Sequence, residues 1–201
     1  MIVIVHGGHE QFNLPSMRMQ DTYRFLIDSG ADAVINGHQH CVSGFEIYKG
    51  KPIYYGIGNL LFNSRSPKVP FGWNEGMLVE LELDKDKISH RYIPYTQCQD
   101  SLSIKLINDT MRFDEMIRNL SDVISSRPKL ENAVNEYYRK SQKAIKSRLQ
   151  PWRGRILQGF FRRGLLPTVV GRKTLRKIQN LVFCESHRDK LKYFLSHSLK
   201  E

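Results

Sequence analysis

Three histidines follow short apolar runs, and histidine is a residue type that binds metal ions. His6 comes directly after the apolar run that opens the chain, and His38 and His40 come after Ala33–Asn36, separated from it by Gly37. Neutral imidazole nitrogen is the commonest protein ligand for ions such as Zn, Fe, Mn and Co. One intervening residue lets the two rings of a His-x-His pair converge, and Gly37 lets the backbone approach an ion. The pattern predicts a metal site at His6, His38 and His40.

Such a site requires two strands that end at the same edge of one sheet. The runs 1–5 and 33–36 have the composition of buried strands, and a helix from Met17 to Ser29 is expected between them because its apolar residues recur at helical spacing. Gly30 then marks the end of that helix. Strand, helix and strand with short connections indicate a βαβ unit, in which ligand sites collect at the carboxyl ends of the parallel strands.

Beyond His40 the pattern changes to consecutive short strands, and from about Leu102 it becomes helical. The expected strands are 44–48, 53–62, 76–83 and 88–95, with turns at 49–52 and 84–87, and the expected helices are 109–126, 130–149, 174–183 and 186–199. The fold class is therefore predicted to be α/β or α+β. We expect residues 1–98 to form one domain and residues 99–201 a basic helical extension.

Cysteine usage and hydropathy limit the cellular compartments in which the chain is expected. Cys41, Cys98 and Cys184 are too few and too scattered for a disulfide framework, which indicates a reducing compartment or free thiols. Cys41 follows His40 and could ligate a metal, or it could be a small buried thiol, since no second cysteine lies at ligand spacing. No apolar run approaches the roughly 20 residues that span a bilayer, and the apolar start is too short for a signal peptide. These features predict a cytoplasmic or membrane-peripheral chain.

Charge divides the chain into two unequal halves. Residues 1–100 hold 9 Lys and Arg against 11 Asp and Glu, whereas residues 101–201 hold 22 against 9. The segment from Trp152 to Leu166 mixes cationic, aromatic and aliphatic residues, a composition that suits an anionic membrane surface. A solvated basic face on helices that pack against the first domain is the alternative. No motif indicates nucleic-acid binding.

An ordered series of motifs resembles a known family. The series is His6-x-Gly-x-Glu10, Gln20, Gly30-Ala31-Asp32-Ala33-Val34-Ile35, Gly37-His38-x-His40, Glu46 with Tyr48, and Gly58-Asn59-Leu60-Leu61-Phe62. It resembles the C-terminal half of the bacterial capsule-synthesis proteins (CapA/PgsA type, linked to poly-gamma-glutamate), which belong to the calcineurin-like metallophosphatase superfamily. The resemblance covers roughly residues 1–98.

The resemblance implies a β-sandwich with flanking helices and a dinuclear metal site. It implies that His6 and His38 ligate one ion of a divalent pair (Mn, Fe or Zn) and His40 the other, for metal-assisted hydrolysis or transfer at a phosphoryl or related centre. Asn59 matches a family position near the site and has a supporting role, and Glu10 could orient His6 or lie on the surface. No residue is assigned as catalytic.

The sequence also departs from the family pattern. The Asp-x-His, Gly-Asp and Gly-Asn-His motifs that open the superfamily do not occur here. Three neutral imidazoles cannot bridge and neutralise two divalent ions without carboxylates. We therefore expect the chain to be inactive alone and to need a complementary N-terminal half or self-association. The alternative is a non-catalytic fragment that binds a partner, an anionic membrane surface or an anionic polymer through its basic helices.

Overall fold

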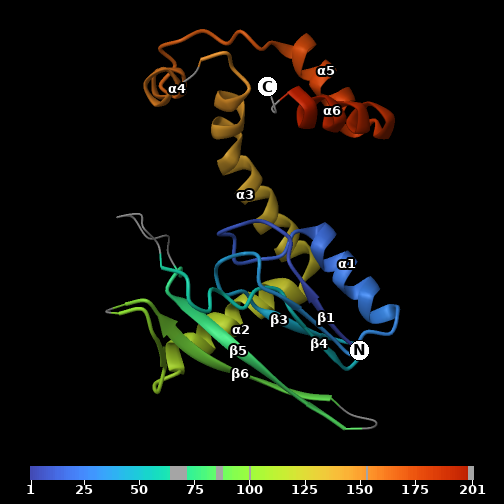
Figure 1. Ribbon diagram of the computed structural model, residues 1–201, viewed down its shortest axis with the longest axis vertical. Helices are drawn as coiled ribbons and strands as arrows, with labels where there is room; N and C mark the ends of the chain where they lie inside the picture. Colours follow the sequence, from blue (N-terminus) through green and yellow to red (C-terminus); the bar gives the residue numbers. More distant parts are fainter. Residues whose placement is uncertain (64–71, 85–87, 100, 153, 199–201) are drawn as a thin grey trace. The chain divides into compact units, whose positions relative to one another are not determined.

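The computed structural model describes residues 1–63, 72–84, 88–99, 101–152 and 154–198, and confirms a mixed α/β fold. The chain divides into two compact units, Met1–Tyr137 (unit 1) and Tyr138–Glu201 (unit 2). The elements shown in Figure 1 are β1 (Ile2–Val5), α1 (Met17–Asp28), β2 (Ala33–Asn36), β3 (Phe45–Tyr48), β4 (Lys51–Tyr54), β5 (Glu75–Leu83), β6 (Ile88–Gln97), β7 (Ile104–Leu106), α2 (Met111–Ser125), α3 (Arg127–Arg148), α4 (Arg155–Arg162), α5 (Arg172–Phe183) and α6 (Glu185–Ser198).

The first sheet has the strand order β1-β2-β4-β3 and contains the predicted βαβ unit. β1 and β2 pair in parallel, with Val5 opposite Asn36, so that both strands end at the same edge. α1 connects them, and its N-terminus is capped by Ser16, whose side chain accepts a hydrogen bond from the Met19 backbone N–H at 3.3 Å. Gly30, with φ +104°, follows the helix as the sequence predicted.

The second sheet has the order β5-β6-β7 and is antiparallel. Its long hairpin, β5 with β6, was predicted, whereas the predicted turn between them lies mostly at 85–87, outside the described residues. β7 was not predicted: we expected the helical region to begin near Leu102, but residues 104–106 pair with the end of β6. Three exposed residues are too short a stretch to show an alternating pattern, and the pairing with β6 decides their conformation.

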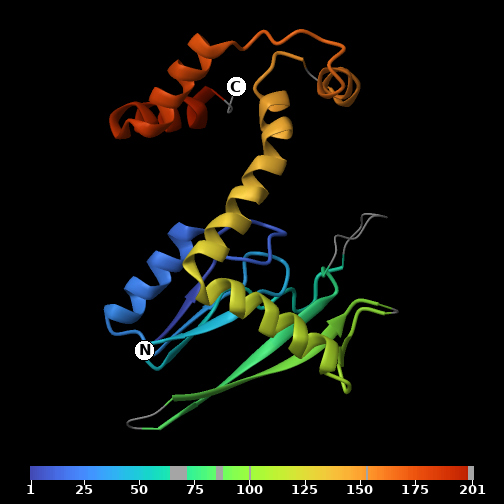
Figure 2. The same cartoon turned by 180° about the vertical axis from the view of Figure 1, so that it is seen from behind.

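The helix α2 packs inside unit 1. Its buried residues Phe113 and Ile117 share a core with Tyr54 of β4 and Met77 of β5, so one helix contacts residues of both sheets. Figure 2 shows α2 lying across them. The approach is close at Gly44, where an added Cβ would lie 2.6 Å from the Ser121 backbone nitrogen. The predicted boundary fell at residue 98, whereas the compact units divide later, because α2 and the start of α3 complete the core of unit 1.

The start of α3 also belongs to unit 1. Leu130 and Val134 join the other hydrophobic core, which includes Tyr23 of α1 and Tyr55. α3 begins at Arg127 rather than at the predicted residue 130, since Pro128 is tolerated in a first helical turn, where no backbone N–H is needed.

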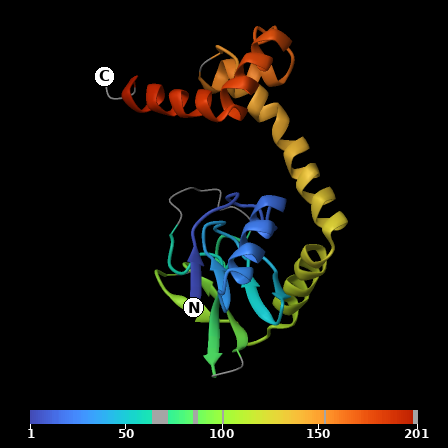
Figure 3. The same ribbon diagram turned by 90° about the vertical axis from the view of Figure 1, so that its right-hand side faces the viewer.

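All the regular elements described in unit 2 are helices. α5 and α6, both predicted, contact each other (Figure 3). α4 was not predicted, because Gly159 lies inside it and Gly154 and Gly164 flank it. In the part of the chain that the structure describes, no helix is both long enough and apolar enough to cross a membrane.

Candidate metal centre

The ends of β1 and β2 bring two of the predicted histidines into contact. The ring centroids of His6 and His38 lie 4.5 Å apart in an edge-to-face arrangement. Two imidazoles on one tetrahedral ion, with nitrogen–metal distances of about 2.0 Å, place their ring centroids roughly 5 Å apart. His40 is farther away, with its centroid 6.1 Å from that of His38. The parallel pairing of β1 and β2 therefore converts a sequence separation of about thirty residues into direct ring contact.

Asn36, which sequence reasoning did not single out, holds the two histidine loops together. Its fully buried amide donates to the carbonyl oxygens of Gly7 (3.0 Å) and Tyr55 (2.9 Å). Its side-chain oxygen accepts from the backbone N–H groups of Gly7 and His38, each at 3.3 Å. The sequence feature that could have identified Asn36 is a polar residue at the last position of an apolar strand. A polar side chain that is buried there must have its hydrogen bonds satisfied by neighbouring groups.

Gln39 fixes the connection between His38 and His40. Its side chain is fully buried and donates to the Leu14 carbonyl at 3.1 Å, while the Gln39 backbone carbonyl accepts from the Gln11 backbone N–H at 2.7 Å. With Gln39 directed into the core, His38 and His40 on either side of it stay only half-buried. His40 has φ +57°, a left-handed conformation that is uncommon for a residue other than glycine and is found more often at functional sites.

Asn59, for which the sequence analysis predicted a supporting role, contacts the His40 ring. The Asn59 Nδ2 group donates to the carbonyl oxygens of Trp73 (3.1 Å) and His40 (3.3 Å), and this leaves Oδ1 facing His40 Nδ1 at 2.8 Å. His40 Nδ1 must then carry the proton, and Nε2 keeps its lone pair. The His40 ring also stacks on Phe62 and Trp73, with centroids 5.6 Å and 5.5 Å away.

Replacing Asn59 with alanine should change the tautomer of His40. Without Oδ1 as an acceptor, Nδ1–H loses its partner and the ring should populate both neutral tautomers, which nitrogen NMR shifts of the ring would show. A residue that orients a ligand in this way contributes about 10- to 100-fold in metal affinity. Asn59→Asp retains the acceptor and should keep the Nδ1–H tautomer. An unchanged tautomer in Asn59→Ala would contradict this role.

Three other residues near the site, Glu10, Cys41 and His9, show no ligand geometry in the described part of the chain. Glu10 is exposed, and among the described residues no hydrogen bond joins its carboxylate to His6. Cys41 is buried, and burial raises the pKa of its thiol to about 12. His9 contacts the rings of Phe12 and Tyr137, and its pKa is lowered, first by burial and then by the Arg18 charge.

The donor set fits part of a metal site. His38 Nδ1 is buried and has no hydrogen-bond partner. A buried polar atom is normally satisfied, so this nitrogen of the ring that contacts His6 is available to bind an ion. Yet no group of three or more His, Cys, Asp or Glu side chains in the described ranges is arranged to hold an ion. Nitrogen donors are present, and the carboxylates that a divalent pair needs are not among them.

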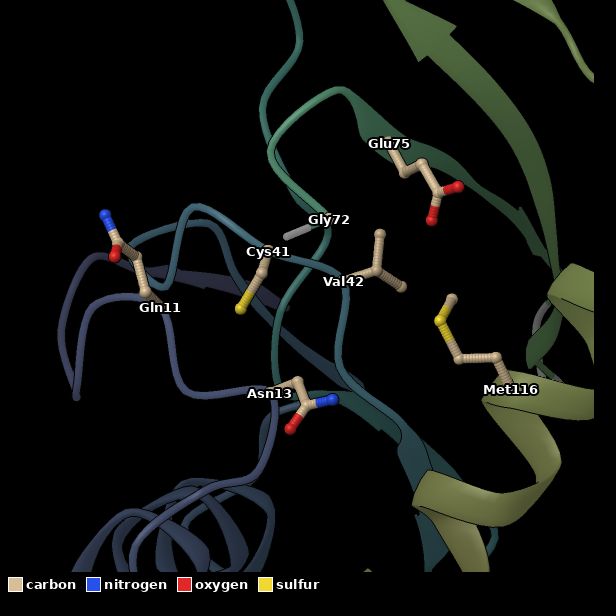
Figure 4. Close-up of a pocket in the computed structure, with 7 residues that line it drawn as sticks. All are labelled: Gln11, Asn13, Cys41, Val42, Gly72, Glu75 and Met116. Atoms are coloured by element: carbon tan, nitrogen blue, oxygen red, sulfur yellow. The ribbon is translucent and has the colours of Figure 1, made fainter. Parts of the chain in front are cut away.

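A pocket of about 230 Å³, with polar and apolar walls, adjoins the loop that carries His40. Figure 4 shows Gln11 and Asn13 coming from the loop after His6, Cys41 beside them, and Glu75 and Met116 from β5 and α2. Glu75 also forms an ion pair with Arg112. Its walls combine amide and carboxylate groups with Cys41, Val42 and Met116, so they suit a ligand with both polar and apolar parts.

Comparison with known proteins adds the family. The model described as "Bacterial capsule synthesis protein PGA_cap" matches residues 1–64, which contain Asn59 and the three candidate ligands His6, His38 and His40. Residues 1–64 are therefore similar to the bacterial capsule synthesis protein family. The resemblance predicted from the motifs is thereby confirmed, and residues 1–64 are called the capsule-synthesis segment below.

Individual relatives agree with this assignment. The chain is 26% identical over 124 residues to "PGA biosynthesis protein CapA" of Bacillus subtilis (strain 168), a match covering 60% of this chain and 31% of that protein. It is 35% identical over 63 residues to "Capsule biosynthesis protein CapA" of Bacillus anthracis, covering 31% of this chain and 15% of the relative. The chain thus spans less than a third of the length of these curated relatives.

Proposed function

We propose that the capsule-synthesis segment contributes His6, His38 and His40 to a metal-dependent hydrolase or transferase site that acts in capsule or poly-gamma-glutamate synthesis. The observation that carries this proposal is the contact of the His6 and His38 rings at the ends of two adjacent parallel strands, 4.5 Å between centroids. The names of the Bacillus relatives, which refer to PGA and capsule biosynthesis, support the assignment to this process.

The proposed assignment of ligands to the two ions follows the family resemblance. His6 and His38 would hold one ion of a Mn, Fe or Zn pair, and His40 would hold the other through Nε2. A bound pair would supply Lewis acidity toward a phosphoryl or related oxygen. The chain's own contribution is positioning: Asn36 fixes the first two imidazoles, Asn59 fixes the third, and Phe62 and Trp73 limit water on the faces of His40.

The carboxylates are proposed to come from a second polypeptide segment. β1 is an edge strand of its sheet, and it exposes apolar side chains, Ile4 at 82% and Ile2 at 41%. An exposed apolar edge favours pairing with a further strand, which would lie next to His6. We propose that this strand belongs to a complementary segment whose carboxylates supply the ligands that the three histidines lack. Without it we expect no hydrolase activity.

Zinc titration of the full chain tests the ligand assignment without an activity assay. Imidazole NMR resonances of His6 and His38 should shift together on adding Zn²⁺, while His90, whose Nδ1 bonds Tyr54 Oη at 2.7 Å, should not. His38→Ala should weaken binding about 30-fold or more, since a single imidazole remains from the close pair. His90→Ala is the matched control and should bind as the wild type does.

The role of the second segment is tested by mixing. The part of the Bacillus subtilis relative that lies outside its match to this chain is added, the mixture is passed through a gel-filtration column, and its metal content is measured. Mn, Fe or Zn should be retained by the mixture in amounts well above those retained by the chain alone. Equal shifts of all histidines on zinc addition, or an unchanged zinc affinity of His38→Ala, would rule out the proposed metal site. This conclusion would hold even if the heterologous segment failed to bind.

A non-catalytic binding role for the basic helices is the second candidate. It rests on a different observation, the surface of unit 2, and does not require the histidines.

A further inference from the structure

Unit 2 leaves its apolar side chains uncovered. None of the hydrophobic side chains described within it is buried. In α4, Ile156 is 74% exposed and Phe160 41%, and Leu165 in the loop that follows is 66% exposed. Exposed apolar surface of this extent, on neighbouring turns of a short segment, marks a surface that contacts a protein or a membrane.

The same unit is strongly basic. Residues 138–201 carry 17 Lys and Arg but only three Asp and Glu. The two kinds of residue are segregated on α5: the basic residues Arg172, Lys173, Arg176 and Lys177 fall on one side at helical spacing, and the apolar residues Leu175, Ile178, Leu181 and Val182 fall on the other. Apolar and cationic faces on one helix are typical of segments that lie in a membrane interface.

An apolar groove of about 260 Å³ lies within this unit. Its walls include Ile145, Leu149, Val170 and Leu175, with Lys146 at its border. Gln150 keeps the groove in shape: its buried side-chain oxygen accepts the backbone N–H groups of Val169 (2.9 Å) and Val170 (3.0 Å) and so holds the loop after α4 against the end of α3. The groove is therefore built by specific hydrogen bonds.

A second hollow, of about 350 Å³, shares Lys146 with the groove. It is lined by Arg162 and by Phe161, Gly164, Leu166 and Thr168. Within the described ranges neither cation has a carboxylate at ion-pair distance; Arg162 donates to Gln158 at 3.3 Å. A cationic hollow beside an apolar groove matches a ligand with an anionic head and a hydrocarbon tail.

We propose that unit 2 binds the surface of an anionic phospholipid bilayer, with a lipid headgroup at Lys146 and Arg162 and hydrocarbon in the groove formed by Ile145, Leu149, Val170 and Leu175. Charge complementarity favours an anionic partner, and the apolar groove favours lipid over a fully ionised polymer, which has no hydrocarbon to place there. This binding is independent of the histidine site.

Vesicle co-sedimentation of the full chain tests the proposal. Vesicles of phosphatidylcholine with about one-third phosphatidylglycerol should bind the chain, binding should fall with added salt, and vesicles of phosphatidylcholine alone should bind at least tenfold less. The double variant Lys146→Gln, Arg162→Gln should lower the partition coefficient about 30-fold, because each cation near an anionic surface contributes about fivefold. Ile145→Gln should lower it about tenfold.

Matched variants in unit 1 separate these effects from net charge and hydropathy. Arg18→Gln, Arg118→Gln removes the same two charges, and Leu106→Gln removes an apolar side chain that is 60% exposed. Both should change the partition coefficient less than threefold. Circular dichroism of every variant checks that the helices are retained.

Three results would overturn the proposal. One is equal binding to neutral and anionic vesicles. Another is an equal loss in the unit 1 and unit 2 double variants. The third is binding of soluble polyglutamate or DNA with none to vesicles, which would assign the basic surface to a polymer.

Discussion

Asn36→Ala is expected to destabilise unit 1 by about 3 kcal/mol and to separate the His6 and His38 rings. Asn36 makes four hydrogen bonds from a fully buried position, and its removal leaves the Tyr55 carbonyl and the Gly7 backbone without partners. A net hydrogen bond contributes about 1 kcal/mol, and a buried group left unsatisfied costs about 1 to 3 kcal/mol. The same bonds set the distance between the two histidine loops.

Two readouts separate the effect on the site from the effect on stability. Urea unfolding is followed by the fluorescence of Trp73, which is 8% exposed in unit 1, in a Trp152→Phe background that silences unit 2. Ring-proton contacts between His6 and His38 are followed by NMR in the absence of denaturant. Asn74→Ala, which removes a single bond of 3.3 Å to the Cys98 carbonyl, is the control and should cost under about 1 kcal/mol. If Asn36→Ala lost no more unfolding free energy than Asn74→Ala and kept the contacts between the His6 and His38 rings, Asn36 would not position the site.

Glu46→Ala is expected to cost about 3 to 5 kcal/mol, the range seen when one partner of a buried ion pair is removed. The Glu46 carboxylate is 8% exposed and accepts two bonds from Arg24, at 3.0 and 2.6 Å, and one from the buried Tyr55 hydroxyl at 2.5 Å. The hydrogen bond to Glu46 is the main reason that the pKa of Arg24 is raised. Without the carboxylate, a cation and a buried hydroxyl lose their partner together.

The exposed pair of Glu80 and Arg91 gives a matched comparison. These side chains also form a two-bond ion pair, at 2.8 and 2.9 Å, but they are 52% and 68% exposed. Glu80→Ala should therefore cost under about 1 kcal/mol. Glu46→Gln, which keeps an acceptor for Tyr55 but loses the charge, should fall between the two alanine variants. Equal urea midpoints for Glu46→Ala and Glu80→Ala would show that the buried ion pair contributes no more to stability than the exposed one.

Local sequence pattern predicted the structure correctly where a residue type strongly favours one backbone conformation. The apolar runs before His6 and His38 are strands because β-branched residues favour a pleated, buried surface, and Gly30 follows α1 because its φ is positive. The glycine pattern around α4 misled the sequence analysis, since Gly154 and Gly164 lie at the helix boundaries and only Gly159 is interior. The flanking glycines, with φ +83° and +79°, limit the helix and do not interrupt it.

The histidines that follow strands, the parallel βαβ arrangement that places them at one edge, and the concentration of positive charge in the second half could all be read from local pattern and composition. Other features became visible only in the folded chain: α2 and the start of α3 complete the core of unit 1, Asn36 links the histidine loops, and Lys146 borders both an apolar groove and a cationic hollow. The two groups of features differ in how far apart the interacting residues are along the chain. Periodicity and glycine positions report interactions over a few residues, whereas a buried amide or a shared groove depends on backbone groups that only folding brings together.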